Sequence, residues 1–556
     1  MLDCLIQFLK YWPYKRAFHV FAILVVEIVF IIIFGLYGRY PPELKSEKFN
    51  ALFPIFADVH VMIYLGIGFI LTFLRKYSLS AVTLCLLIGS ISLQWYIISA
   101  GLLNYMSGVT TEFSVTVDTT NLLFGDFAAA TVLISFCVVM GKVTVLQLLI
   151  MTLAEVLLYV GNEYIGRSLL FGFDVGATIF LHLFAIVFGL SVSRMLYIED
   201  VDESKLSTST ESNLFSLLGT LILWIYWPSF MASGAIPGPP QERSMSNTYL
   251  ALTGSVMGAL CMSSLTHENG KIRIEHVQNA VLAGGVAVGA TADLIVWPFL
   301  SILIGLVAGI LSTCGFVFTP TFIHKKLKIH DSCAAFSLHA IPALLGSLVS
   351  IIIPCFLNQQ NLGGNYPELL PAVAQGRSRA GQSIAQVAAV LTTIATATVG
   401  GLITGGVMRL IGSLQLDGNV LLPIADILDD EYNIHIEATD LPPIHIHNQR
   451  RPSRAFFSRA SFSQFRNNFA DMSNISESES LPPPPTQFNS ETGEEITGLK
   501  DASTSPTCNR RPRRLSLNIG HLYSNGSECP TAYIKIDEEI AVGGLTNHGL
   551  EFDKTS

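Results

Sequence analysis

Long apolar runs, repeated along most of the chain, are the feature that most constrains its fold. An α-helix rises about 1.5 Å per residue, so about 20 apolar residues cross the hydrocarbon core of a bilayer. Runs of about this length occur at residues 17–37, 60–75, 79–103, 122–141, 143–166, 173–197, 213–236, 247–265, 276–294, 296–319, 332–357 and 383–413. The sequence therefore predicts an all-α polytopic membrane protein with about twelve transmembrane helices.

The composition agrees with a membrane protein and excludes several other classes. Charged residues make up only 13% of the chain and the mean hydropathy is +0.50, too apolar for a soluble protein of 556 residues. The sequence has no basic, nucleic-acid-binding character. It shows no nucleophile and base pair, phosphate-binding loop or metal-ligand spacing, and its nine cysteines have no paired spacing. We therefore expect neither an enzyme nor a cofactor nor a structural metal.

The distribution of basic residues predicts the orientation of the chain. Cytoplasmic loops carry an excess of Lys and Arg. With the N-terminus inside, most basic residues at helix ends become cytoplasmic; the exceptions that fall outside are Arg39, Lys45, Lys48, Arg167, Arg243, Arg377 and Arg379. We expect both termini in the cytosol, in a multi-pass protein of the plasma membrane.

One run contains two ionisable residues. Asp174 lies near the start of residues 173–197, and His182 follows eight residues later, about 12 Å along a helix and about 80° around it. An ionisable residue in lipid costs about 2.5–3.5 kcal/mol, so both should face a protein interior or a pathway. A pair of satisfied structural residues is the alternative.

Two other runs are rich in glycine. Gly285 and Gly289 in one run, and Gly401 and Gly405 in another, have the spacing with which small residues allow helices to approach closely. These runs should pack against neighbouring helices in a compact bundle.

The composition changes after about residue 415. We expect residues 1–415 to form the transmembrane domain and residues 416–556 to form a cytoplasmic, largely disordered tail. Two arginines precede each of Ser453 and Ser516, a spacing that basophilic kinases accept, so both serines are candidate phosphorylation sites. A solvated basic linker is the alternative, and cytosolic partners of the tail stay open.

Six stretches together resemble the Rh-glycoprotein branch of the ammonium transporter family, over roughly residues 15–415. They are FADVHVMIYLGIGFILTFLRKYSLSAV (56–82), VLQLLIMTLAEVLLYVGNEY (145–164), DVGATIFLHLFAIVFGLSVSRMLY (174–197), LWIYWPSF (223–230), HVQNAVLAGGVAVG (276–289) and DSCAAFSLHAIPALLG (331–346). The resemblance implies a homotrimer in which each subunit, an inverted-repeat helix bundle, encloses its own pore.

The resemblance also implies a gate and a pore lining. Phe127 and Phe230 match the two gate phenylalanines, and Asp174 matches a carboxylate that orders the recruitment region. His182 matches the first of two facing pore histidines. His339 matches the second, because it stands directly before a small residue in the final stretch.

Further positions match less directly. Glu163 matches an acidic vestibule position, with a merely solvated carboxylate as the alternative, and Asn279 is a polar residue of the pore and recruitment region. Phe336 replaces a histidine of the Rh pattern; one hypothesis places its ring beside the two histidines, and plain core packing is the other interpretation. Met231 replaces the asparagine that commonly follows the WPSF stretch.

These assignments favour a channel or transporter for ammonium or ammonia. Two alternatives remain: a non-conducting Rh-like membrane scaffold, and a channel for carbon dioxide. Costly polar groups retained in lipid favour the first, because a pure scaffold has no physical reason to keep them.

Overall fold

The computed structural model describes residues 14–41, 46–197 and 207–415 of the 556-residue chain. Within these ranges, eleven helices are long and apolar enough to cross a membrane. This confirms the all-α polytopic fold expected from the apolar runs. The two short strands in these ranges, β1 (Gly38–Arg39) and β2 (Val115–Thr116), pair in parallel outside those helices.

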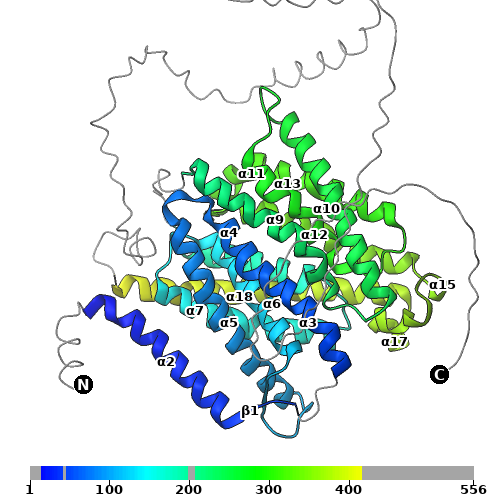
Figure 1. Ribbon diagram of the computed structural model, residues 1–556, viewed down its shortest axis with the longest axis horizontal. Coiled ribbons are helices and arrows are strands. Elements are labelled where there is room, and N and C mark those ends of the chain that lie inside the picture. Colours follow the sequence, from blue (N-terminus) through cyan, green and yellow to red (C-terminus); the bar gives the residue numbers. More distant parts are fainter. Residues whose placement is uncertain (1–13, 42–45, 198–206, 416–556) are drawn as a thin grey trace, which may run out of the picture. The chain divides into compact units, whose positions relative to one another are not determined.

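The first part of the bundle extends from α2 to α8 (Figure 1). Its helical elements are α2 (Tyr14–Tyr37), α3 (Ser46–Val61), η1 (Met62–Ile67), α4 (Gly68–Ile70), η2 (Leu71–Phe73), η3 (Arg75–Tyr77), α5 (Ser78–Met106), α6 (Thr119–Val139), α7 (Val145–Tyr164), η4 (Ile165–Leu169), η5 (Thr178–Leu183) and α8 (Phe184–Met195). The elements η1, η4 and η5 are π-helical, and each directly continues or precedes an α-helix of a membrane-spanning segment.

The second part extends from α9 to α18. Its elements are α9 (Thr210–Ala232), α10 (Pro239–Leu265), α11 (Ile274–Asn279), η7 (Ala280–Leu282), α12 (Ala283–Val288), η8 (Gly289–Thr291), α13 (Pro298–Leu327), η9 (Phe336–Ala340), α14 (Ile341–Ile352), η10 (Ile353–Phe356), α15 (Gln359–Leu362), η11 (Gly363–Asn365), α16 (Tyr366–Leu369), α17 (Pro371–Ala374) and α18 (Arg379–Gln415). The element η9 is again π-helical.

The expected helix 276–294 is not one long helix, which is why eleven long helices stand where twelve runs were counted. It is divided among α11, η7, α12 and η8. Ser255 Oγ donates to Ala280 O and accepts from Gly284 N, replacing the backbone bond between these two residues. A second hydroxyl interrupts the backbone hydrogen bonds in the same way: Thr178 Oγ1 donates to Val286 O and accepts from Ala290 N. Side chains inserted into the backbone ladder are a known cause of helix breaks.

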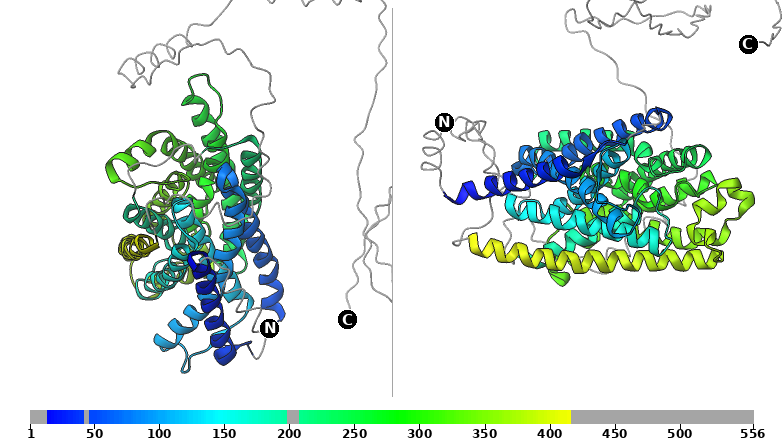
Figure 2. Two further views of the ribbon diagram at one scale, coloured as in Figure 1. Left: turned by 90° about the vertical axis from the view of Figure 1, so that its left-hand side faces the viewer. Right: turned by 90° about the horizontal axis from the view of Figure 1, so that it is seen from below.

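Close helix packing at the glycines is as expected. A Cβ at Gly401 would lie 2.6 Å from Phe188 O, and a Cβ at Gly405 would lie 3.0 Å from Val192 O. The missing side chains therefore let α18 approach the backbone of α8. In Figure 2 the long helix α18, in yellow, runs along one side of the bundle.

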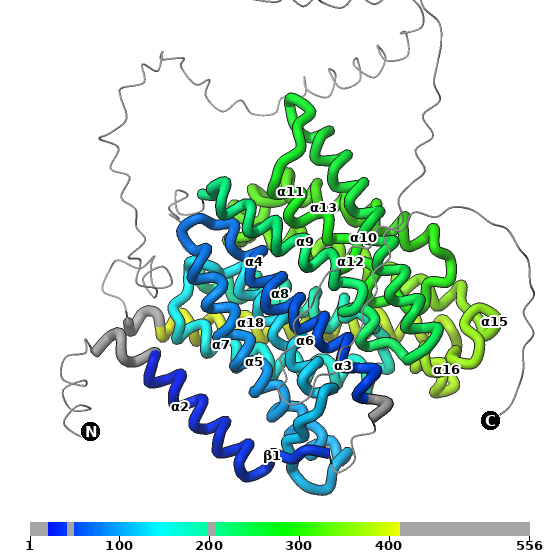
Figure 3. The backbone as a smooth tube through the Cα atoms, viewed as in Figure 1, coloured from blue at the N-terminus to red at the C-terminus, as the bar shows by residue number. Residues whose placement is uncertain are grey.

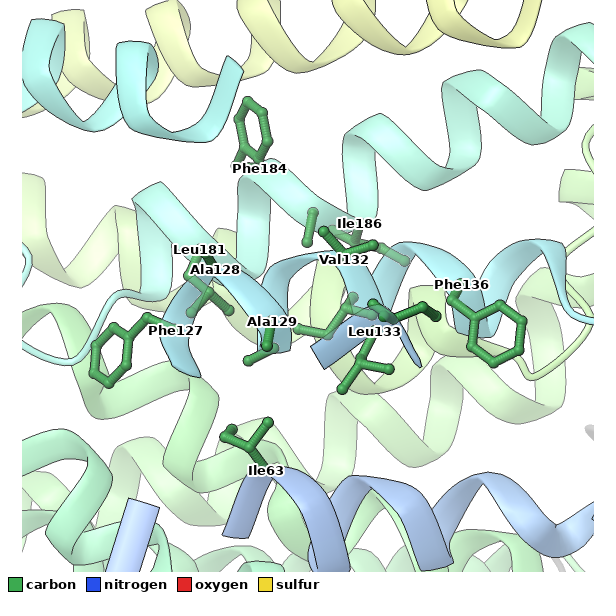
Figure 4. Packing of buried hydrophobic residues seen from close by; sticks show 14 of the residues in the cluster. Ile63, Phe127, Ala128, Ala129, Val132, Leu133, Phe136, Leu181, Phe184 and Ile186 are labelled. Carbon is green, nitrogen blue, oxygen red and sulfur yellow. The ribbon is translucent and has the colours of Figure 1, made fainter. Parts of the chain in front are cut away.

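The helix α2 lies at the outside of the bundle, where Figure 3 shows it in dark blue beside α5 and α7. Between Val20 and Tyr37 only Phe30 is buried, and the sequence is apolar, as expected of a helix that faces lipid or another subunit. The interior, in contrast, contains many fully buried apolar side chains. Figure 4 shows Ile63 of η1 opposite Ala129 and Leu133 of α6, with Leu181 of η5 nearby.

Candidate functional site

Two buried histidines meet in the centre of the bundle. His182 on η5 and His339 on η9 are 3% and 9% exposed. Their Nδ1 atoms lie 3.2 Å apart, and the rings are stacked with centroids 5.3 Å apart. A hydrogen bond at this distance requires one Nδ1 to carry a proton and the other to accept it. The structure thus joins the two histidines that the sequence comparison had paired; we call them the histidine pair.

A capped turn positions each histidine. Asp174 Oδ2 accepts from the backbone N–H groups of Ile179 and Phe180 at 2.7 and 2.8 Å, at the start of η5. These bonds satisfy donors that a helix start leaves unpaired. Ala177, directly before η5, adopts a left-handed conformation with φ of 57°. Asp174 therefore fixes the direction in which η5 enters the bundle.

The second histidine has the same support, which the sequence analysis did not identify. Asp331 accepts from the backbone N–H groups of Ala335 and Phe336 at 3.0 and 2.8 Å, at the start of η9. Ala334 is left-handed with φ of 53°. The signal was present in the sequence: an aspartate stands eight residues before His182 and again eight residues before His339.

Two phenylalanines lie in contact beside the histidine pair. Phe127 on α6 and Phe230 on α9 have ring centroids 4.4 Å apart, and both are buried. The Phe230 ring meets the His182 ring edge to face at 6.2 Å, and Trp227 stacks on His182 at 5.8 Å. The two residues expected to form a gate thus contact each other, and one of them, Phe230, also contacts His182. For this expected role we call Phe127 and Phe230 the gate pair.

A cavity contains the histidine pair. Its lining is predominantly apolar and includes Phe230, while Asn279 contributes an amide and Cys137 and Cys333 contribute thiols. Asn279 Nδ2 also donates to Glu275 O. Asn279 thus lies in the wall of the same cavity as the histidine pair, and its role in a pore stays a prediction.

Phe336 lies elsewhere. Its ring is half-buried against the apolar core, and it does not line the cavity, to which Leu338 contributes instead. Among the described residues it makes no ring contact with either histidine. In this structure Phe336 therefore packs in the apolar core; it is the first residue of η9, and its backbone N–H donates to Asp331.

Glu163 is not a free carboxylate. Its Oε1 accepts from Arg167 Nε at 2.8 Å, one helical turn away. Arg167 also donates to the backbone oxygen of Asp174 at 2.7 Å and lies over the Phe180 ring at 5.1 Å. Glu163 thus belongs to a chain of contacts that leads to Asp174, and its negative charge is balanced by a neighbouring cation.

Met231 is fully buried and packs against Gly176 and Gly289. Ser453, Ser516 and the tail 416–556 lie outside the described residues, and the assignments made for them stay predictions. In the part of the chain that the structure describes, no group of three potential metal ligands occurs.

The fold and this site define a multi-pass membrane protein that encloses a largely apolar cavity, with a hydrogen-bonded histidine pair inside it and a phenylalanine pair beside it. The sequence matches the profile of the Ammonium Transporter Family over residues 20–419. The chain belongs to this family, on its Rh branch, as the six sequence stretches had indicated.

Three ammonium transporters of the Rh types are similar to this chain over most of its length. The chain is 37% identical over 401 residues to the ammonium transporter Rh type A of Bos taurus, a match that covers 69% of this chain and 88% of that protein. It is 36% identical over 405 residues to Rh type B of Oryzias latipes, covering 69% and 87%. Rh type C of Oryctolagus cuniculus is 34% identical over 451 residues, covering 77% and 94%.

Solved structures share the fold. Nitrosomonas europaea Rh50, of the Rhesus protein family of channels, matches with a TM-score of 0.55 at 25% identity, over 78% of this chain and 99% of that one. Mep2 of Saccharomyces cerevisiae matches with a TM-score of 0.56 at 16% identity, over 71% and 94%. At that lower identity the likeness shows the fold alone.

Proposed function

We propose that this chain conducts ammonium, as neutral ammonia or an equivalent, through the cavity that contains the histidine pair. The observation that carries the proposal is the buried contact between His182 and His339 within a lining that is otherwise mostly apolar. The names of the relatives, ammonium transporters of Rh types A, B and C, support the same substrate.

The lining favours a neutral molecule. An ammonium ion that entered an apolar passage would lose its hydration shell at a large cost in free energy, whereas ammonia would lose much less. The ion therefore has to release its proton, or the proton has to take a separate route, before the cavity is crossed. The gate pair stands where this change of environment occurs, and aromatic faces also attract a cation that approaches them.

The histidine pair offers a contact to the passing molecule. His182 Nε2 is buried in the cavity wall and has no hydrogen-bond partner in the described structure. If His182 Nδ1 donates to His339, its Nε2 is free to accept a hydrogen bond from an N–H of ammonia; if Nδ1 accepts, Nε2 carries a hydrogen that it can donate in a hydrogen bond to the ammonia nitrogen. In either tautomer, one polar contact replaces part of the lost hydration.

The remaining features follow from the family resemblance. We propose a homotrimer in which each subunit conducts, with both termini in the cytosol and residence in the plasma membrane. Asp174 and Asn279 act around the entrance and lining of the passage. Glu163 contributes by holding Arg167 beside Asp174 rather than as a free recruiting charge.

The test is uptake by proteoliposomes under an imposed ammonium gradient, with internal pH and membrane current recorded together. We expect rapid alkalinisation without current in the wild type, and altered rates in His182→Ala and His339→Ala. His267→Ala is the matched control, because His267 lies in the turn after α10, outside the cavity lining. Equal rates in all four proteins would remove the histidine pair from the mechanism.

A silent wild type, with a known transporter active in the same assay, would overturn the proposal. The same vesicles would then be tested for carbon dioxide permeability. A second silent result would favour the non-conducting scaffold.

A further inference from the structure

Two polar contacts join α3 to the helices that carry the gate pair. Ser229 Oγ on α9 donates to Asp58 Oδ2 at 2.6 Å. On the other side, His60 Nδ1 lies 3.0 Å from Asp126 Oδ2 on α6. We call these contacts the α3 ties. They span 171 and 66 positions of the sequence, so they fix tertiary rather than local structure.

Each tie ends directly beside the gate pair. Ser229 is the residue before Phe230, and Asp126 is the residue before Phe127. A change in the position of either tied residue is therefore transmitted through a single peptide unit to a gate ring. Since the two rings are in contact at 4.4 Å, their separation depends on how α6 and α9 are held relative to each other.

The helix geometry of α3 explains how it reaches both neighbours. Asp58 and His60 are two positions apart, which places their side chains about 200° apart around the helix. The helix α3 contacts both α6 and α9. It can therefore hold both gate helices, with one side chain directed to each.

The α3 ties lie at positions where apolar side chains would cost less free energy than ionisable ones. All three ionisable members of the ties lie in membrane-spanning segments, where such residues are costly and are kept for a specific role. Asp126 is completely buried, and its Oδ1 has no hydrogen-bond partner in the described structure. The contact of Oδ2 with His60 therefore offsets the free-energy cost of burying this carboxylate. Pro228 next to the other tie cannot donate a backbone hydrogen bond, which leaves this part of α9 more dependent on side-chain contacts.

We propose that Asp58 and His60 are gate-positioning residues: by holding Ser229 and Asp126 they set the separation of the gate pair, and thereby the size of the molecule that passes. This inference rests on the proposed conduction of ammonium. It concerns selectivity rather than the chemistry at the histidine pair, because neither residue lines the cavity.

The experiment compares uptake of ammonium and of the larger methylammonium by proteoliposomes that contain the full chain. The ratio of the two rates does not depend on the amount of active protein, so a variant that merely folds less well leaves it unchanged. Asp58→Leu and His60→Leu each remove one tie. We expect each to change the ratio about fivefold, the effect of one lost hydrogen bond on a rate-determining geometry.

Matched variants separate positioning from bulk. Asp58→Asn keeps an oxygen that accepts from Ser229, and should retain a ratio close to that of the wild type. Ser229→Ala removes the same tie through a single hydroxyl and remains informative if Asp58→Leu does not fold. The combination of Asp58→Leu with Ser229→Ala should change the ratio no more than either alone, because both remove one contact. Phe53→Leu, at an exposed position of α3, is the control.

Phe230→Ala, which alters the gate pair directly, shows whether the ratio reports on the gate. If Phe230→Ala changes the ratio while Asp58→Leu, Ser229→Ala and His60→Leu all leave it unchanged, the α3 ties do not position the gate and the inference is overturned. If the wild type takes up neither substrate, the proposed function itself fails, and this inference fails with it.

Discussion

Asp174 and Asp331 occupy equivalent positions in the two parts of the bundle. Each carboxylate accepts two backbone N–H groups at the start of a π-helical turn, and each stands eight residues before one member of the histidine pair. A left-handed alanine lies three residues after each aspartate. The contact between the histidines is thus made by two copies of one local motif, as expected of a fold built from two repeats.

This relationship predicts the effect of replacing either aspartate. Asp174→Asn and Asp331→Asn remove the negative charge at the start of a helical turn and weaken its cap, which moves the histidine on that turn. The loss of a cap and of a favourable helix-end charge corresponds to about a tenfold lower transport rate. Initial rates in proteoliposomes, normalised to protein content, would measure it.

The control for this pair is Asp118→Asn. Asp118 caps α6 through the N–H of Asn121 but lies outside the cavity lining, so its replacement should leave the rate within about twofold of the wild type. Unchanged rates in both Asp174→Asn and Asp331→Asn would show that the caps do not set the histidine geometry.

Arg167 and Glu163 give a second prediction. Because the charge of Glu163 is already balanced by Arg167, Glu163→Gln should change the apparent affinity for ammonium less than about threefold. Arg167→Gln should have the larger effect on rate, since it also removes the bond to the Asp174 backbone. The dependence of uptake on ammonium concentration would separate an effect on affinity from an effect on rate. A large loss of affinity in Glu163→Gln alone would restore the free-carboxylate interpretation.

The glycines of α18 give a third prediction, on stability. A Cβ at Gly401 would lie 2.6 Å from a backbone oxygen of α8, which cannot move aside easily. Gly401→Ala should therefore destabilise the fold by about 1–3 kcal/mol, the usual cost of overpacking. At Gly406 the nearest atom is the end of the Met195 side chain at 3.7 Å, so Gly406→Ala should be neutral or slightly stabilising. Thermal unfolding in detergent would compare the two; equal melting temperatures would contradict the packing argument.

The sequence predicted most of the fold, because hydrophobic length is a local property. It did not predict the division of residues 276–294, where hydroxyl groups of Ser255 and Thr178 enter from elsewhere in the chain. The spacing of apolar residues within that segment does not indicate that a side chain from another helix inserts there.

Only part of the candidate site was predictable from the sequence. The match to a family placed His182 and His339 together although they are 157 positions apart. The pairing of Glu163 with Arg167 was available from their spacing of four residues on a helix and was missed. The α3 ties could not be foreseen, because each joins helices whose adjacency exists only in the folded bundle.

Lys142 provides the last prediction, on pH dependence. It lies in the turn between α6 and α7, where its Nζ donates to Ser193 Oγ at 3.0 Å and to His330 O. Burial lowers the pKa of Lys142 to about 7 from its ordinary 10.5, and the negative charge of Asp331 opposes this shift only in part. The charged lysine is therefore a cost to the fold.

The sign of the effect follows from proton binding. Between the folded pKa of about 7 and the ordinary 10.5, the unfolded chain holds a proton on Lys142 that the folded protein lacks, so this group makes the fold more stable as pH rises. Below the folded pKa both states are protonated and the whole cost is present. Lys142→Met removes that cost, and should raise the melting temperature relative to the wild type more at about pH 6 than at about pH 9. Lys271→Met, at an exposed position, should shift the melting temperature by the same amount at the two pH values. An equal shift for Lys142→Met would mean that the lysine is not charged at a cost inside the fold.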